Sequence, residues 1–272
     1  MRAGLIRHLH VSDAVDTHQL FLNSLQVLGI KVFYHQNYLL YLLMICHKKI
    51  NSRDLGCHMS LQWTSIFLYA DDILLVAPSV HMLQEMLNCC EIELLWLDMR
   101  INAKKSACIR FGPRYDTDCF QIVTTNGDII EWANAIRYLG VYFVSGRFFK
   151  CNWEHAKSSY YRSFNAIFGR IGRFVSVETV MYLIKSNCIP VLIYGVEACP
   201  THSSDIKTLD HPIIATFIKV FNTKSADVIR DCQMAFGFRS LHEQILTRKI
   251  NFVNKCISCP NSIFSVTLAN CA

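Results

Sequence analysis

The stretch that most constrains this chain is Phe67–Ala77 (FLYADDILLVA), where two adjacent aspartates lie between two runs of strand-forming apolar residues. Aspartate is disfavoured in strands, and an ionised carboxylate in apolar surroundings is costly unless another charge compensates it. A β-hairpin satisfies both constraints, with one strand ending at Leu68, a turn near residues 70–72 and a second strand starting at Ile73. Divalent cations such as Mg²⁺ bind carboxylate oxygens, so they are the expected compensating charge. Paired carboxylates that hold Mg²⁺ at a hairpin tip suit phosphoryl transfer, in which two metal ions bind the attacking and leaving oxygens.

The segments around this hairpin make the signal more specific. FLYADDILLVAPS resembles the Tyr-x-Asp-Asp motif of reverse transcriptases, in the form used by LINE-type (non-LTR) retrotransposons. Four more segments resemble that family in the same order and at similar spacing: Gly56–Met59 (GCHM), Trp96–Ser106 (WLDMRINAKKS), Ile136–Tyr142 (IRYLGVY) and Pro190–Ala198 (PVLIYGVEA). From about Asn51 to about Lys255 the chain therefore resembles the second half of a LINE polymerase. The alternative for Asp71 and Asp72 is an ordinary acidic turn.

The resemblance implies roles for individual residues. Asp71 would be the main ligand of catalytic Mg²⁺ (or Mn²⁺), with Asp72 as its supporting partner, and a third aspartate from an earlier motif would complete the site. The residues expected near the primer or the incoming nucleotide are Tyr69, Ala70, Lys104, Tyr138, Leu139 and Gly140. Among these, Lys104 would lie near the triphosphate, and residues 138–140 would form the primer-grip hairpin. The alternatives are a surface lysine for Lys104 and a plain β-turn at Gly140.

Basic residues gather in one segment. Arg147–Lys185 contains seven lysines and arginines against two glutamates, a net charge of +5 out of the chain's +6. A local basic surface suits a phosphate backbone, which is bound without regard to sequence and in a salt-dependent way. The expected nucleic-acid-binding residues are Lys157, Arg162, Arg170 and Arg173, and the partners that the resemblance implies are an RNA template and a DNA primer. A solvated helix face is the alternative.

The pattern of elements predicts an α+β fold. An antiparallel sheet backed by helices is expected over residues 51–146, as a partial reverse-transcriptase palm. A thumb-like helical region is expected over 147–200 and a helical C-terminal region over 201–272. Apolar residues at helical spacing predict a helix over Val80–Met99 with Ser79 as its N-cap. The dipeptide Asn126-Gly127 predicts a hairpin.

Residues 1–50 do not fit this pattern. The run Tyr38–Cys46 is apolar without a period, and the family's QGGVLSP template loop and DDL segment are missing from the region. Plausible codons for Lys31–His47, read one base back, can encode KGVLSPKLFAIFVDDLS, which resembles the missing segment. We therefore hypothesise that residues 1–49 or so are an out-of-frame translation joined to polymerase sequence near Asn51. A divergent N-terminal segment with its own fold is the alternative.

The missing segments limit the expected activity. Asp13 and Asp16 precede Asp54 but lack the family's FDxVxH context, so the third catalytic aspartate has no candidate. The chain is thus expected to be an N-terminally truncated fragment of an RNA-directed DNA polymerase, a nucleotidyltransferase, that is inactive alone. A non-catalytic nucleic-acid-binding protein and a transposon relic without function are the alternatives.

The thirteen cysteines are irregularly spaced, and no secretory signal precedes them. This favours reduced thiols without disulfide partners in an intracellular, cytoplasmic or nuclear protein. The longest apolar stretch, Tyr38–Cys46, is much shorter than the roughly 20 residues of a membrane span, so no membrane is expected.

Overall fold

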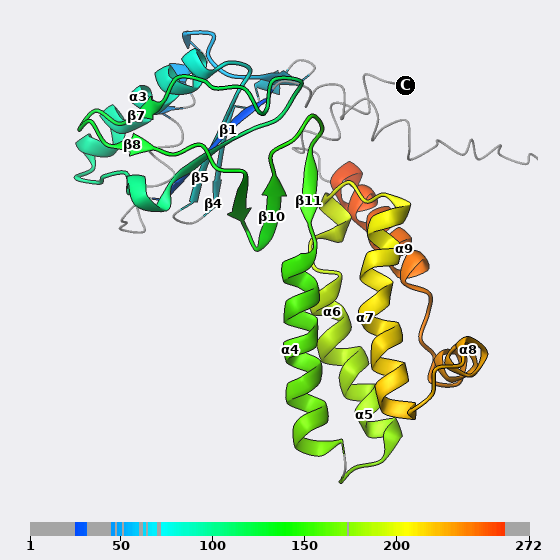
Figure 1. Ribbon diagram of the computed structural model, residues 1–272. Helices are drawn as coiled ribbons and strands as arrows, with labels where there is room; N and C mark the ends of the chain where they lie inside the picture. The colour runs from blue at the N-terminus through cyan, green and yellow to red at the C-terminus, as the bar shows by residue number, and fades with distance from the viewer. Residues whose placement is uncertain are drawn as a thin grey trace, which may run out of the picture. The chain divides into compact units, whose positions relative to one another are not determined.

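The computed structural model describes residues 25–31, 45–46, 48–50, 52–59, 62–63, 65–69, 72–172 and 174–258. This part of the chain contains both antiparallel sheets and helices, with most strands before most helices, which confirms the α+β class (Figure 1). The chain divides into two compact units. The first holds the described residues up to Tyr138 together with 143–150, and the second holds 139–142 and the described residues from Cys151 onward.

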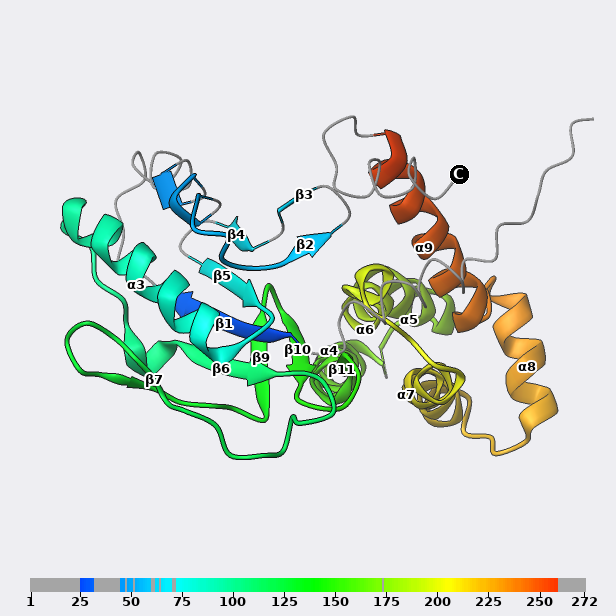
Figure 2. The ribbon, with the colours of Figure 1, turned by 90° about the horizontal axis from the view of Figure 1, so that it is seen from above.

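A four-stranded antiparallel sheet forms the centre of the first unit (Figure 2). Its strand order is β4-β5-β1-β6. The strands are β4 (Ile66–Tyr69), β5 (Asp72–Ala77), β1 (Gln26–Lys31) and β6 (Ala107–Arg110). The hairpin expected around the two aspartates is therefore present as β4 and β5.

Strand β1 comes from the segment that the sequence suggested was out of frame. Val27, Leu28 and Ile30 are at most 9% exposed, and β1 pairs with β5 on one side and β6 on the other. Because side chains alternate along a strand, QVLGIK can bury both faces inside a sheet. Part of residues 1–50 thus belongs to the core. The hypothesis about the reading frame concerns the DNA and stays a prediction.

Helix α3 (Val80–Trp96) packs on one face of this sheet. The Ser79 hydroxyl accepts a hydrogen bond from the backbone N–H of Met82 at 3.2 Å, which confirms the expected N-cap. The helix side chains in the core include Leu83, Met86, Leu87, Cys90 and Leu94. They share this core with Leu28, Ile30, Ile73 and Leu75 from the sheet. The helix ends at Trp96, three residues before the predicted end.

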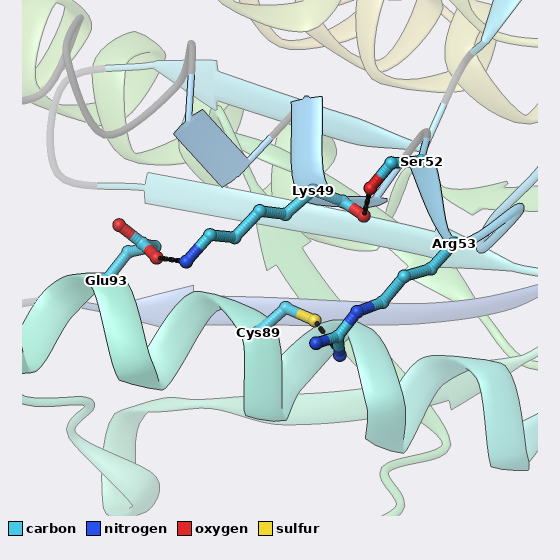
Figure 3. A network of polar contacts seen from close by, with 5 residues as sticks. All are labelled: Lys49, Ser52, Arg53, Cys89 and Glu93. Atoms are coloured by element: carbon cyan, nitrogen blue, oxygen red, sulfur yellow. Dashed lines mark hydrogen bonds and ion pairs between the residues drawn. The ribbon is translucent and has the colours of Figure 1, made fainter.

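A polar network of Lys49, Ser52 and Arg53 contacts two largely buried side chains of α3, Cys89 and Glu93 (Figure 3). The Lys49 ammonium forms an ion pair with the Glu93 carboxylate, and Arg53 Nη1 donates to Cys89 Sγ at 3.2 Å. Ser52 Oγ donates to the Lys49 carbonyl at 3.0 Å. Ile50, between these polar residues, is fully buried in the same core as α3.

The remaining strands of the chain are short. They are β2 (His58–Met59), β3 (Gln62–Trp63), β7 (Ile122–Val123), β8 (Ile129–Ile130), β9 (Ala135–Tyr138), β10 (Val141–Val144) and β11 (Lys150–Asn152). Strands β7 and β8 pair around Asn126-Gly127, with Gly127 at φ 85°, as that dipeptide predicts. The three-stranded sheet has the order β11-β10-β9. A 3₁₀ helix, Ala103–Lys105, precedes β6.

The second unit is helical. Its helices are α4 (Glu154–Ile171), α5 (Val177–Leu183), α6 (Ile189–Leu192), α7 (Ser203–Phe221), α8 (Ala226–Ala235) and α9 (Leu241–Ser258). Helix α4, the α5–α6 run and α7 lie side by side (Figures 1 and 2). Their shared core includes Tyr160, Phe164, Ile184, Leu192 and Phe217. The Tyr160 hydroxyl, which is fully buried, hydrogen bonds to Thr216 Oγ1 at 2.9 Å.

The run Val177–Ala198 is the one candidate membrane span by length and composition in the described part of the chain. A π-helical turn, Ile184–Cys188, joins α5 to α6, and Pro190 is tolerated because it lies at the start of α6. Val180, Ile184, Cys188 and Leu192 are at most 2% exposed within the helical unit. We therefore assign this run to the core of the unit. All eleven cysteines among the described residues are free thiols.

Candidate functional site

The carboxylate hairpin is tighter than the sequence suggested. Tyr69 and Asp72 are Cα partners, so only two residues separate the strands. Asp72 is the first residue of β5 and is half-buried, whereas Tyr69 is 63% exposed at the tip. Ala70 and Asp71 lie outside the described residues, as does Arg173 of the predicted basic set.

The alternation of β5 directs Asp72 away from α3. Ile73 and Leu75 belong to the core under α3, whereas Leu74 and Val76 belong to a second cluster on the other face of the sheet. Asp72 has the same parity as Leu74 and Val76, so its side chain projects toward this second face. Ile136 of β9 belongs to the second cluster too.

Tyr138, two residues beyond Ile136, ends up near the Asp72 carboxylate. The phenol of Tyr138 is partly buried, and burial raises its pKa above 10.0. The negative charge of Asp72 raises this pKa further, because a nearby anion disfavours the tyrosinate. The first unit thus brings together Asp72 of one family-like segment and Tyr138 of another.

The turn after Tyr138 is a tight β-turn. Leu139 and Gly140 have φ values of 47° and 85°, which is the left-handed pair of a two-residue hairpin turn between β9 and β10. These two left-handed residues separate β9, which ends at Tyr138, from β10, which begins at Val141. The Tyr194 hydroxyl donates to the Leu139 carbonyl at 3.1 Å. A Cβ at position 140 would lie 3.0 Å from Cε1 of Tyr194. Both the positive φ and this close approach therefore favour glycine at position 140.

The described residues do not make up a two-metal centre. They contain no group of three or more histidine, cysteine, aspartate or glutamate side chains that could hold a metal ion. Asp72 is the one carboxylate that the described residues place at the hairpin tip. Strand β1 runs beside β5 with Lys31 as the Cα partner of Asp72.

Lys104 lies in the 3₁₀ helix and is exposed. The Asn102 side chain caps this turn by accepting a hydrogen bond from the Lys105 N–H at 3.2 Å. Within the described residues no hydrogen bond or ion pair joins Lys104 to Asp72. A role near a triphosphate stays a prediction for Lys104.

The predicted basic residues of α4 do not share one surface. Residues on a helix are about 100° apart, so Lys157 lies near the buried Phe164, whereas Arg162 lies on the opposite side and Arg170 about 80° further round. Lys157 forms an ion pair with Glu154 at 2.5 Å and its side chain is only 19% exposed. Arg162 and Arg170 are exposed. Of the described basic candidates on α4, these two form the surface that could meet a phosphate backbone.

Two features escaped the sequence reasoning. Tyr194 belongs to the family-like segment Pro190–Ala198, but only its distance to Gly140 in the fold indicates that it supports the turn. Strand β1 was missed because residues 1–50 lack turn signals and family motifs. The alternation within QVLGIK was the available signal.

No protein-family model matches this chain, and no curated protein matches it in sequence.

Proposed function

We propose that this chain is a C-terminal fragment of a LINE-type reverse transcriptase that binds nucleic acid and does not polymerise DNA alone. The first unit corresponds in this proposal to part of the palm, and the second to the thumb and the region after it. RNA and DNA are the proposed partners, inside the cell. Mg²⁺ would be the ion that the family uses at Asp71 and Asp72.

The observation that carries the proposal is the proximity of Asp72 and Tyr138. They belong to two segments that are far apart in the sequence, and each resembles a different motif of the polymerase site. Burial in the first unit and the charge of Asp72 both act on the Tyr138 phenol. An accidental YADD string gives no reason for the other segment to lie beside it.

The incomplete set of carboxylates argues against polymerisation. Two-metal phosphoryl transfer needs several carboxylates around the ions. The sequence supplies Asp71 and Asp72, but the third aspartate of the family's site has no candidate in this chain. Loss of one member of a catalytic set typically lowers the rate by orders of magnitude.

Primer extension tests whether the chain alone polymerises DNA. The purified chain is incubated with an RNA template, a DNA primer and deoxynucleotides in Mg²⁺ or Mn²⁺, and we expect no extension. Extension that disappears in both Asp71→Ala and Asp72→Ala would overturn this part of the proposal, because it would show a working polymerase.

Salt-dependent binding tests the nucleic-acid role. We expect Arg162→Gln/Arg170→Gln to weaken binding of an RNA–DNA duplex and to lower the slope of log affinity against log salt by up to about 2, since each lost phosphate contact removes roughly 0.9. Lys224→Gln/Arg230→Gln, in the same unit, removes equal charge from another surface. If both double variants bind like the parent chain, the proposed surface is wrong, and if the parent does not bind nucleic acid the proposed function fails.

A further inference from the structure

A pocket of about 820 Å³ opens at the first turn of α3, away from the Asp72 hairpin. Pro78, Ser79 and Val80 line one side, and the loop that follows β6 lines the other. Its volume lies within the range of roughly 300–1,000 Å³ that is usual for small-ligand sites. All of its lining residues belong to the first unit.

Two of the lining residues, Gln26 and Arg110, belong to a row of three residues across the sheet. Gln26 pairs with Ala77 of β5 on one side and with Arg110 of β6 on the other, so the three side chains share a face. That face is the one that α3 covers, because Leu28 and Cys108, two residues along their strands, lie in the core under the helix. The row thus lies where the helix begins.

Gln26 carries an unpaired polar atom in this row. The residue is only 7% exposed, and its Oε1 is buried without a hydrogen-bond partner in the part of the chain that the structure describes. Leaving a buried acceptor unpaired costs about 1–3 kcal/mol. A bound molecule that donates an N–H or O–H to this oxygen would remove that cost.

Arg110 adds a buried positive charge. It is 9% exposed, and its Nη2 donates to the Thr117 carbonyl and to Thr117 Oγ1. The guanidinium lies 5.9 Å from the centre of the Trp132 ring. Among the described residues no ion pair joins it to a carboxylate, and a guanidinium has five N–H donors, so several remain for a ligand. Burial of a cation without an anion is unfavourable.

Besides Arg110, the lining contains one positive and one negative side chain, and both are exposed. Arg114 adds a second cation, and Asp118 is the only carboxylate among the described lining residues. The pocket thus carries one more positive than negative charge. Phe120, which is 88% exposed, supplies an aromatic wall against which a planar ring can pack.

We propose that this pocket binds a small organic anion in which a phosphate or carboxylate is attached to a ring that carries a hydrogen-bond donor. The anionic group would contact Arg110, the ring would pack against Phe120, and the donor would reach Gln26 Oε1. The pocket is separate from the nucleic-acid surface on α4, and the proposal does not depend on the chain's ancestry.

Titration calorimetry with the full chain and four probes tests this site. The probes are adenosine monophosphate, adenosine, inorganic phosphate and 4-hydroxybenzoate. We expect the nucleotide, the hydroxybenzoate or both to bind at least about tenfold more tightly than adenosine or phosphate, because only these two combine an anion, a ring and a donor. Which of the two binds better identifies a phosphate or a carboxylate source.

Variants then assign the contacts. Gln26→Met keeps the shape of the side chain, removes the unpaired oxygen and is expected to fold. It should weaken the tighter probe about tenfold or more and leave phosphate unchanged, whereas Gln233→Met in the second unit should change neither. Arg110→Met should abolish binding of the anionic probes. Because Arg110 is buried, this variant can fail to fold, and in that event Arg114→Gln, at an exposed cation of the lining, should weaken binding of the same probes.

Alkylation gives a second readout. Cys119 lines the pocket and is half-buried, so the tighter probe should slow its reaction with iodoacetamide without protecting Cys232 of the second unit. Failure of every probe to bind, or binding that Gln26→Met and Arg114→Gln both leave unchanged, would overturn the proposal.

Discussion

The charge of Asp72 acts on the phenol of Tyr138, across the space between strands β5 and β9 of the first unit. Burial is the larger cause of the raised pKa of Tyr138, and the aspartate adds to it. The pair thus measures whether the hairpin tip and the end of β9 come together in solution.

Replacement of Asp72 by asparagine should lower the pKa of Tyr138 part of the way toward 10.0. The substitution removes the anion that disfavours the tyrosinate, while the effect of burial remains. Ultraviolet titration of the tyrosines, with and without Asp72→Asn, measures the change. In a Tyr138→Phe background the same substitution should leave the titration curve unaltered, and a change that persists there would refute the contact.

Truncation of Leu28 tests whether β1 is part of the folded core. The residue is 0% exposed, so Leu28→Ala should lower the free energy of unfolding by about 2–5 kcal/mol. Leu95→Ala makes the same chemical change on α3, at a residue that is 52% exposed, and should cost less than about 1 kcal/mol. Denaturant unfolding followed by circular dichroism compares them, and equal effects would mean that β1 is not buried in solution.

The ion pair between Lys49 and Glu93 gives a second test of the N-terminal segment. Lys49→Met leaves the largely buried Glu93 carboxylate without its cation. Because the lysine is 48% exposed and solvent screens the pair, we expect a loss of about 1–2 kcal/mol.

Two further variants isolate this pair. The neighbouring exposed lysine supplies a control, Lys48→Met, that should change stability by less than about 0.5 kcal/mol. Adding Glu93→Gln to Lys49→Met should recover most of the loss in thermal or denaturant unfolding, and no recovery would show that packing of the Lys49 stem explains the effect.

Glu91 should make the chain less stable as pH rises. Burial raises its pKa above the ordinary 4.5, against the opposing effect of hydrogen bonds from Thr125, whose backbone N–H lies 2.8 Å from Glu91 Oε2. The folded state therefore holds this proton more tightly than the unfolded state, and the stability it contributes is present below pH 4.5 and lost as pH rises through the raised pKa. Relative to the parent chain, Glu91→Gln should gain stability across this window.

Glu178 supplies a control of opposite sign. Hydrogen bonds from its own backbone N–H and from Ser176 lower its pKa, so its contribution is present above pH 4.5 and lost as pH falls. Glu178→Gln should therefore lose stability relative to the parent chain as pH rises through the same range. Denaturant unfolding between pH 4 and pH 8 measures both trends, and parallel trends for the two variants would contradict these assignments.

Two glycine-to-alanine changes should have opposite effects. At Gly140, φ is 85° and an added Cβ would lie 3.0 Å from the Tyr194 ring, so Gly140→Ala should cost about 1–2 kcal/mol or more. At Gly169, within α4, nothing lies within 4 Å of an added Cβ, and Gly169→Ala should stabilise by about 0.5–1 kcal/mol. Thermal unfolding of both variants checks the signs, and a neutral Gly140→Ala would argue against the tight turn.

The elements with local signals could be predicted from the sequence. Ser79 and the apolar spacing after it indicated α3, and Asn126-Gly127 indicated the β7–β8 hairpin, because capping and turn preferences depend on neighbouring residues. The second partner of β5, strand β1, could not be predicted in this way. Strand β1 forms because it is buried between β5 and β6, which lie far from it in the sequence. Its six residues carry no turn signal that would indicate a strand or its partners.

The candidate site could be predicted from the sequence only in part, for the same reason. Motif order placed Asp72 and Tyr138 in one expected site, but the support of the 139–140 turn by Tyr194 depends on packing within the second unit. The split of the basic residues of α4 follows from helix geometry, which sets Lys157 beside the core and Arg162 away from it. Net charge along a segment carries no such information.

The position of β1 inside the sheet has a consequence for synthesis on the ribosome. About 80 residues separate Gln26 from its partner Arg110, so at roughly 5–20 residues per second β1 waits on the order of 4–16 s before β6 is made. During that interval one edge of an apolar strand has no partner and can pair with another chain. Slow translation or a lack of chaperones should therefore lower the soluble yield of this protein more than its final stability suggests.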